Sequence, residues 1–251
     1  MTAIRWCVLA VGVSFMLLAG DHGFAETAND DEGPTWHFDS AASGELPSGW
    51  RIDGTAQEGP FATWAVTGEP GAPSGANALA LTASNHQSAS TFNLCWTPAA
   101  NYFDGTASTR FKITGGTLDP GAGVAWRIQD RNDYYVCYLH PAVRSLRVWV
   151  VSDGRAKELA STTVAIEPET WHALTVQQSG ERITCALNGK ELLSVKDDTI
   201  SREGGVGFWT AADTTAAFDD LSVAVETEKA PEKKRMPKER TRQGTRYLEG
   251  S

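Results

Sequence analysis

The sequence predicts an all-β domain built from antiparallel strands. Three short turns carry this prediction, because each separates two runs of alternating apolar and polar residues: Ser152-Asp153-Gly154, Ser179-Gly180 and Asn188-Gly189. Asn-Gly is the strongest short hairpin signal, since both central residues of a type I′ turn need a positive φ. No helical period lies between these turns, so the region is expected to be a run of hairpins.

Alternation within the strands indicates which side of the sheet is buried. Leu174 and Val176 alternate with polar residues in one strand, and Ile183, Cys185 and Leu187 do so in the next. Such alternation predicts a sheet with one dry face, and therefore a sandwich of two sheets. Further strands are expected at residues 78–82, 90–96, 107–114, 123–129, 133–140, 144–151, 206–210 and 216–225.

The first 25 residues have the pattern of a secretory signal peptide. Arg5 gives a positive start, Trp6–Ala19 is an apolar run that is short for a membrane span, and Gly23-Phe24-Ala25 fits a cleavage site. We therefore expect a periplasmic or secreted protein with no transmembrane anchor after cleavage. A retained N-terminal anchor is the alternative.

One β domain is expected between residues 34 and 225. Residues 26–33 form a short acidic linker, and residues 226–251 form a charged tail with no apolar period, which predicts disorder. The tail holds eight Lys or Arg against five Glu, so contact with an anionic envelope surface is a second interpretation. The formal net charge of the whole chain is −9, which argues against nucleic-acid binding.

The cysteine pattern excludes a fully paired disulfide framework. Cys7 leaves with the signal peptide, so Cys95, Cys137 and Cys185 remain, an odd number. Cys185 occupies a core-facing strand position, where a free thiol behaves as a small apolar group. A single bridge among the three stays open. No CxxC or HxxxH spacing occurs, so the sequence does not predict a zinc site.

Several segments carry a family resemblance in their order along the chain. They read WHFDSAASGELPSGW, GVAWRIQDRNDYYVCYLHP, RSLRVWVVSDGRAKELASTTV, TWHALTV, ITCALNGKELL, GGVGFWTAAD and FDDLSV. This pattern resembles the concanavalin A-like lectin/glucanase superfamily. More narrowly, it is similar to bacterial laminin-G-like jelly rolls related to the 3-keto-disaccharide hydrolase (DUF1080) group. The resemblance implies a two-sheet antiparallel jelly-roll sandwich. Such proteins include carbohydrate-binding modules and glycosidases.

The chain departs from the typical members of that group at both ends of the domain. Phe38-Asp39-Ser40 stands where they have Phe-Asn-Gly, and Phe218-Asp219-Asp220 stands where they have an Arg-Asn pair. No strand carries the alternating carboxylates of a laminarinase, and acidic residues near turns, Glu158 among them, are expected to be solvated. No catalytic residue is therefore predicted. A non-catalytic carbohydrate-binding or envelope-interaction domain is favoured. A glycoside hydrolase or 3-keto-glycoside-cleaving enzyme is the alternative, and a structural domain with a protein partner is a further one.

A polysaccharide or oligosaccharide is the expected ligand, held on an aromatic and arginine-bearing sheet face. Sugar sites combine aromatic faces with a few polar groups that fix hydroxyls. Alternation on four strands brings the following residues to one face: Arg127, Gln129, Tyr134, Tyr138, His140, Arg147, Trp149 and Trp209. Trp126 is expected on the opposite, core face with Val124 and Ile128. The alternative is that these aromatic rings merely cover the sheet.

A structural calcium ion is implied by the resemblance alone. In related sandwiches the last strand often supplies an aspartate to a calcium near the N-terminal strand. The matching residues here are Asp220 and Asp39. Calcium takes six to eight oxygen ligands. The alternative is that one of these aspartates accepts hydrogen bonds from backbone N–H groups in a turn.

Overall fold

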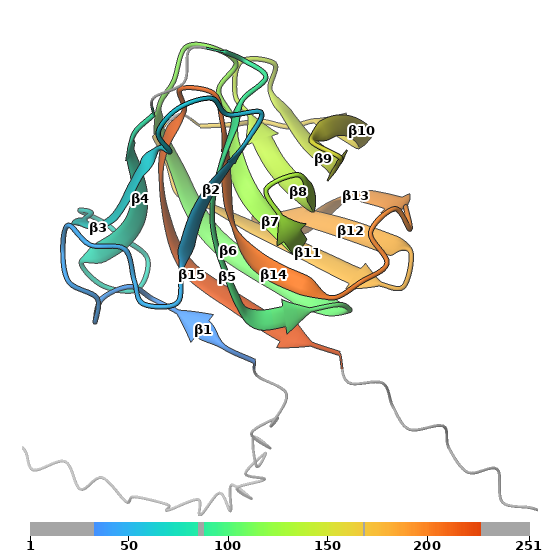
Figure 1. Cartoon of the computed structure of the whole chain (residues 1–251), viewed down its shortest axis with the longest axis horizontal. Helices are drawn as coiled ribbons and strands as arrows, with labels where there is room; N and C mark the ends of the chain where they lie inside the picture. Colours follow the sequence, from blue (N-terminus) through green and yellow to red (C-terminus); the bar gives the residue numbers. More distant parts are fainter. Residues whose placement is uncertain (1–32, 85–87, 168, 227–251) are drawn as a thin grey trace, which may run out of the picture. The chain divides into compact units, whose positions relative to one another are not determined.

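The computed structural model describes residues 33–84, 88–167 and 169–226, whose strands are drawn in Figure 1. The strands are β1 (Thr35–Trp36), β2 (Arg51–Thr55), β3 (Thr63–Gly68), β4 (Asn77–Ala83), β5 (Phe92–Tyr102), β6 (Gly105–Gly115), β7 (Ala122–Asp130), β8 (Asp133–His140), β9 (Ser145–Ser152), β10 (Arg155–Thr163), β11 (His172–Ser179), β12 (Arg182–Leu187), β13 (Lys190–Lys196), β14 (Gly204–Ala211) and β15 (Thr215–Val225). The described ranges contain no helix. Accordingly, none of them offers a helix long and apolar enough to cross a membrane. The predicted signal peptide and nearly all of the linker and tail lie outside the described residues.

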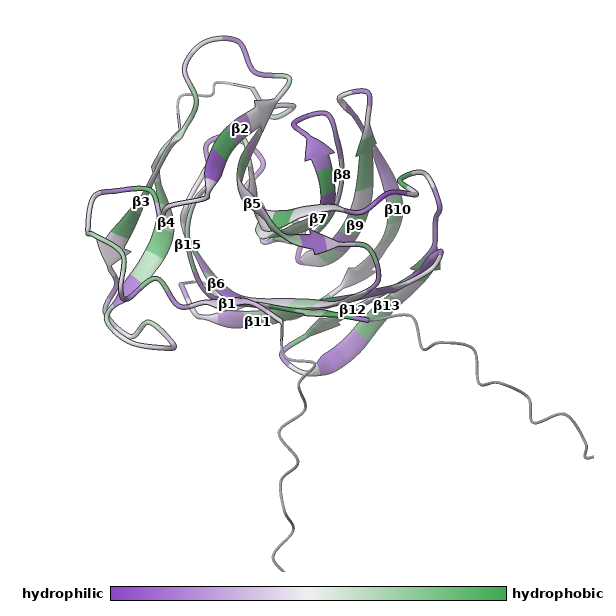
Figure 2. Cartoon of the chain, turned by 60° about the horizontal axis from the view of Figure 1, so that its bottom comes forward, coloured by the Kyte–Doolittle hydropathy of each residue, from purple (hydrophilic) through white to green (hydrophobic). Residues whose placement is uncertain are grey.

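The strands form two antiparallel sheets, which confirms the predicted sandwich. One has eight strands in the order β13-β12-β11-β6-β15-β4-β3, with β1 paired to β15 beside this path. The other has seven strands in the order β10-β9-β8-β7-β14-β5-β2. In Figure 2 the seven-stranded sheet curls strongly, so that β2 and β8 rise on opposite sides of it.

Two of the three predicted hairpin turns have a positive φ at both named residues. Asn188 and Gly189, which join β12 to β13, have φ of 51° and 78°. Asp153 and Gly154, between β9 and β10, have φ of 51° and 73°. The left-handed conformation at both central positions is what a type I′ turn requires, so these pairs fix the register of their hairpins.

Three strands near the N-terminus escaped the sequence prediction. β1 has two residues, β2 reads RIDGT and β3 reads TWAVTG, so none shows a long apolar alternation. Their place in the sheets comes from pairing with β15, β5 and β4. Backbone hydrogen bonds to a formed neighbour stabilise such strands, and a single sequence does not reveal that neighbour.

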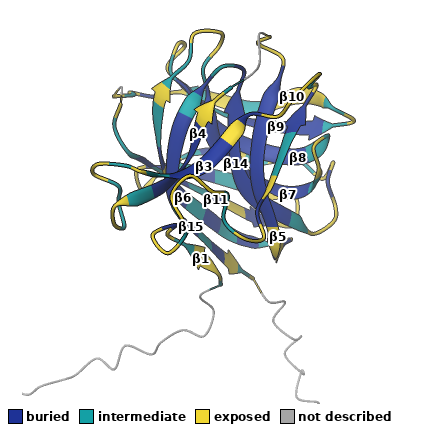
Figure 3. Cartoon of the chain, turned by 60° about the vertical axis from the view of Figure 1, so that its left-hand side comes forward, coloured by how far each residue is buried: buried dark blue, intermediate teal, exposed yellow. Residues whose placement is uncertain are grey.

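The main core lies between the two sheets. The central strands are buried along almost their whole length, as Figure 3 shows for β8 and β14. Tyr135, Cys137 and Leu139 of β8 enter this core, whereas Tyr134 and Tyr138 belong to a second apolar cluster on the opposite face. Burial on both faces explains why these strands read as nearly continuous apolar runs. Cys95, Cys137 and Cys185 are buried and unbridged.

A bulge in β7 corrects one prediction about faces. The pairing of β7 with β8 shifts between Trp126 and Asp130, and Arg127 has a φ of 47°. Trp126 packs in the main core, as predicted, and its Nε1 donates to Gln178 Oε1 at 2.7 Å. Ile128 was expected beside it but lies in the second cluster, because an extra residue reverses the side-chain alternation beyond the bulge.

Candidate functional site

The second apolar cluster defines what we call the aromatic face, the side of the seven-stranded sheet that is turned away from the main core. Its buried aromatic residues are Phe92, Trp96, Tyr134, Tyr138 and Trp209, with the half-buried Trp149 packed against them. Their rings interlock: the centroid of Tyr138 lies 4.7 Å from that of Trp209 and 4.8 Å from that of Trp149. The structure therefore brings together the predicted Tyr134, Tyr138, Trp149 and Trp209.

Trp149 is the ring of this face that reaches solvent. It lies on β9, where the Trp149–Glu158 pair is in direct register with β10. Trp149 Nε1 donates to Glu158 Oε2 at 3.3 Å, and Arg147 Nη1 lies 3.3 Å from the same oxygen. The side chains of Arg147 and Glu158 are 26 and 43% exposed, so a partly exposed indole and an ion pair lie together at the surface.

Glu158 is held in its charged form by the groups around it. Ser161 Oγ donates to Oε1 at 2.8 Å, and this hydrogen bond is the main reason that the pKa of Glu158 falls below its usual value. Burial of the carboxylate acts in the opposite direction, while the bond from Trp149 and the charge of Arg147 lower the pKa further. Arg147 is also oriented by Ser145, whose Oγ accepts from Nε at 2.9 Å.

Tyr138, His140 and Asp119 continue the site along β8. His140 Nε2 is 2.5 Å from Asp119 Oδ1, and the side chain of His140 is only 5% exposed. Burial raises the pKa of Tyr138 well above its usual value, and the charge of Arg147 opposes this shift whereas the charges of Asp119 and Glu158 add to it. The Tyr138 hydroxyl is therefore neutral and lies within the field of one arginine and two carboxylates.

The loop that carries Asp119 is held by Asp213, which lies in the turn between β14 and β15. Asp213 accepts hydrogen bonds from the backbone N–H groups of Thr117 and Leu118 at 2.9–3.0 Å. Burial of Asp213 opposes its ionisation, but the hydrogen bonds from Leu118 and Thr117 outweigh this and lower its pKa. Asp119 itself has a φ of 92°, which is rare for a residue with a side chain. A well-tied loop thus holds Asp119 against His140 in a strained backbone conformation.

Strand β2 covers the other side of the aromatic face. Thr55 Oγ1 lies 2.8 Å from Tyr134 Oη and donates to the carbonyl of Arg131 at 2.5 Å. Trp209 Nε1 also donates to Tyr134 Oη, at 3.2 Å. The curl of the sheet therefore ties its edge strand to β8, and Tyr134 and Trp209 are completely buried.

Two predicted binding residues do not lie on this face, which corrects the prediction for them. Arg127 is 1% exposed and donates to the carbonyls of Phe103, Ile200 and Gly180 and to Asp104. Gln129 donates to the carbonyl of Glu203 at 2.8 Å and to that of Arg127. The β7 bulge redirects both side chains away from the tyrosines. Strict alternation along the strand hid this, because a bulge has no signal in a single sequence.

Two residues of the site were not predicted. Glu158 is solvent-exposed, as expected, and it also contacts Trp149, Arg147 and Ser161, which was not predicted. The hairpin turn at Asp153-Gly154 contained the signal, since it sets the register that places Glu158 opposite Trp149. Asp119 stands in a loop, and its approach to His140 depends on tertiary folding.

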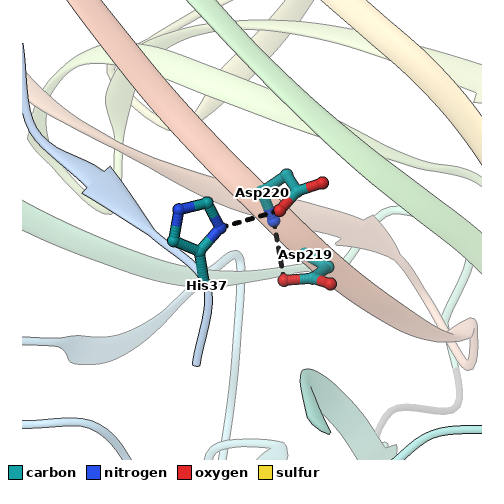
Figure 4. A group of neighbouring side chains, drawn as sticks. All are labelled: His37, Asp219 and Asp220. Carbon is teal, nitrogen blue, oxygen red and sulfur yellow. Dashed lines mark hydrogen bonds and ion pairs between the residues drawn. The ribbon is translucent and has the colours of Figure 1, made fainter. Parts of the chain in front are cut away.

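A second group of polar side chains lies where β15 meets the N-terminal segment. Figure 4 shows His37 pointing toward Asp220, with Nδ1 and Oδ1 2.8 Å apart, and Asp219 beside them. Atoms of these three residues that could bind a metal lie within 4.8 Å of one another. Asp220 Oδ2 is also 3.6 Å from Arg110 Nε. A surface pocket lined by Trp36, His37, Asp39 and Ser74 adjoins the group.

Asp39, one of the two predicted calcium ligands, and Asp219, which was not predicted, contact the same loop. Asp39 Oδ1 accepts from the backbone N–H groups of Ala76 and Asn77, and Asp219 accepts from the backbone N–H and hydroxyl of Ser74. Asp219 is fully buried, and burial raises its pKa. The Asp219 carboxylate also accepts from the backbone N–H of Asp220 at 2.8 Å. Of the two predicted calcium ligands, Asp220 lies with His37 and Asp219 in the group that could hold a metal ion, whereas Asp39 lies outside that group and accepts from two backbone N–H groups.

The family model for the 3-keto-alpha-glucoside-1,2-lyase-like domain matches residues 36–224 of the chain. The chain belongs to this family. The match spans nearly the whole sandwich, from β1 to the end of β15, and it includes every residue of the aromatic face and of the Trp149–Glu158 pair. A comparison with curated proteins finds no match.

Solved structures of other proteins share the fold of this family member at low sequence identity. Carbohydrate-binding module CBM66 from Bacillus subtilis is 19% identical, with a TM-score of 0.54 over 69% of this chain and 93% of that one. Cellulose induced protein Cip1 is 18% identical, with a TM-score of 0.56 over 77% of this chain and 98% of the other. A Bacillus subtilis protein of unknown function with a galectin-like fold is 13% identical, with a TM-score of 0.50 over 70% and 88% of the two chains. At these identities the likeness establishes the jelly-roll fold.

Proposed function

We propose that this domain binds a carbohydrate at the Trp149 site, formed by Arg147, Trp149 and Glu158 at the edge of the aromatic face. The carrying observation is the half-exposed Trp149 ring, which packs on Tyr138 and is flanked by a surface ion pair. Sugars stack their C–H faces on indole rings, and a guanidinium and a carboxylate can hold adjacent hydroxyls. Membership of a family named for glucoside chemistry supports a carbohydrate ligand.

The supporting rings give this site a rigid base. Trp149 contacts Phe92, Tyr138 and Trp209 with centroid separations of 4.8–6.2 Å. A ring that is already immobilised loses little conformational entropy when a ligand stacks on it. The exposed part of Trp149 is therefore a prepared surface, and the buried rings beneath it maintain its orientation.

Export and envelope contact complete the proposal. The N-terminal signal-like sequence supports a periplasmic or secreted location, and the lysine- and arginine-rich tail supports contact with an anionic envelope surface. Calcium held by Asp219 and Asp220 would lie where β15 meets the N-terminal segment. The carbohydrate site itself is assembled by β8, β9 and β10.

A polysaccharide panel tests the binding proposal. The mature protein is expected to be retained on at least one neutral glycan class, with calcium or with chelator present. Retention is expected to be weakened in Trp149→Ala and in Arg147→Ala. Trp171→Ala is a matched control, because Trp171 is a half-buried tryptophan stacked by Lys112 on the other sheet. Equal loss in the control variant, or no retention on any glycan, would contradict the proposal.

A sugar-cleaving enzyme is the second candidate, and one observation favours it. Asp119, His140, Tyr138 and Glu158 lie along the same end of the face, with two carboxylates and an arginine acting on one phenol. Such a group is suited to moving a proton on a bound sugar. The test is product release from glucosides and 3-keto-glucosides. Turnover that disappears in Tyr138→Phe and His140→Asn, with sugar binding kept, would establish the enzyme.

A further inference from the structure

The covered part of the aromatic face limits what the Trp149 site can hold, and this inference rests on the proposed function. We propose that the site takes a chain end or a short saccharide of about one or two residues, and not an internal stretch of a polysaccharide. An internal stretch would need an open face on both sides of Trp149. The sheet is closed on one of those sides.

The closure is made by β2. Thr55 is bonded to Tyr134 and to the backbone of Arg131, which joins the edge of the sheet to β8. Further along β2, Asp53 Oδ2 accepts from Trp96 Nε1 at 3.0 Å, and the Arg51 guanidinium lies 5.2 Å from the centre of the Trp96 ring. Asp53 and Arg51 thus cover Trp96 of β5, and Thr55 closes the sheet onto Tyr134, so the aromatic face is closed on the side of β2.

The number of stacking rings leads to the same conclusion. A face that binds an extended glycan needs a separate exposed ring, or a row of free polar groups, for each successive sugar. Among the described aromatic residues of the aromatic face, only Trp149 is partly exposed, while Phe92, Trp96, Tyr134, Tyr138 and Trp209 are at most 6% exposed. One platform supports one stacked sugar, with its neighbour held by the polar rim.

The charged residues around Trp149 also determine which ligand charge the site favours. Arg147 is already paired with Glu158, and the Asp119 side chain, 51% exposed, adds a further negative charge. An anionic sugar would meet these two carboxylates against one arginine that is already neutralised. The geometry therefore favours neutral saccharides over uronic acids or sulfated sugars.

Oligosaccharide ladders test the length limit directly. Gluco-, xylo- and fructo-oligosaccharides, from the monosaccharide up to about six residues, are titrated into the full chain by calorimetry. Affinity is expected to level off at the disaccharide, with less than about threefold further gain in longer members. A polysaccharide is then compared with the same material after partial hydrolysis at equal mass. Binding capacity is expected to rise with the number of chain ends.

A pair of arginine variants locates the boundary of the site. Arg147→Ala is expected to weaken every member of the ladder alike. Arg51→Ala, a change of the exposed arginine on β2, is expected to leave the length profile unchanged. Affinity that rises about tenfold or more between the second and sixth residue, or that depends on Arg51 in the longer members, would overturn the length limit alone. No binding of any saccharide would overturn the proposed function and this inference with it.

Discussion

Trp149 and Glu158 face each other across the β9–β10 hairpin, and the indole Nε1 donates to the carboxylate at 3.3 Å. This cross-strand pair links the buried aromatic cluster to the polar surface. On one side Trp149 packs against Tyr138 and Phe92, and on the other Glu158 holds Arg147. The β9–β10 hairpin thus places the partly exposed Trp149 ring next to the charged side chains of Arg147 and Glu158.

Variants of Trp149 and Glu158 measure the contribution of the stacking ring separately from that of the charged residues beside it. Trp149→Ala is expected to lower saccharide affinity by about 0.5–1.5 kcal/mol through lost ring contacts alone. Glu158→Gln keeps the shape but removes the charge opposite Arg147, and a smaller loss is expected. Calorimetric titration with the best saccharide measures both. If Trp171→Ala, on the other sheet, weakens binding equally, the effect is one of folding.

The pH dependence of binding follows from Glu158. Its pKa in the folded protein lies below the usual value, because Ser161 donates to the carboxylate. The ionised form, and with it the Arg147 pair, is therefore present at neutral pH and lost as pH falls through this lowered value. Affinity should stay level from neutral pH down to the ordinary glutamate range near about 4.3 and fall below it. Glu158→Gln should remove that fall; a fall that begins near pH 6 to 7 would point to another group.

Arg127 is expected to matter for stability and not for binding. Its buried guanidinium holds four oxygens from three separate segments. Arg127→Met leaves those carbonyls and Asp104 without their donor, so the free energy of unfolding should fall by about 3–5 kcal/mol. Urea denaturation measures the loss. Arg51→Ala is the control variant, because Arg51 is exposed, and it is expected to change the free energy of unfolding by less than about 0.5 kcal/mol.

Calcium should stabilise the domain if Asp219 and Asp220 bind it. At a calcium concentration about a hundredfold above its Kd, the gain is about 2.7 kcal/mol, or a Tm rise of roughly 5–10 °C for a domain of this size. The raised pKa of Asp219 means that, without calcium, stability falls as pH rises through the window above the usual aspartate value. Calcium should offset that fall at neutral pH.

Variants at the three aspartates distinguish the ligands. Asp219→Asn and Asp220→Asn are each expected to reduce the calcium-dependent rise in Tm, while Asp39→Asn, which changes an acceptor of backbone N–H groups, should keep most of it. An identical Tm with calcium and with chelator in the unaltered protein would show that the Asp219 and Asp220 carboxylates are satisfied by Ser74, His37, Arg110 and the Asp220 N–H.

The sequence was informative wherever local chemistry is decisive. Asn188-Gly189 and Asp153-Gly154 predicted hairpins because few other pairs adopt two successive positive φ angles. Alternation placed Tyr138, Trp149 and Trp209 on one face, and the structure shows their rings in contact. The same rule misplaced Arg127 and Gln129, because one extra residue in β7 inverts every face beyond it.

By itself, then, the sequence determined the two-sheet antiparallel fold, the main core and the aromatic character of one face, since period-two alternation and turn residues act over a few positions. Only the tertiary structure decided which part of that face reaches solvent. The curl that brings Thr55 onto Tyr134 joins residues 79 positions apart, and the loop that brings Asp119 to His140 is tied by Asp213 from another part of the chain. Such contacts depend on how the whole sheet bends, and no local pattern encodes that bending.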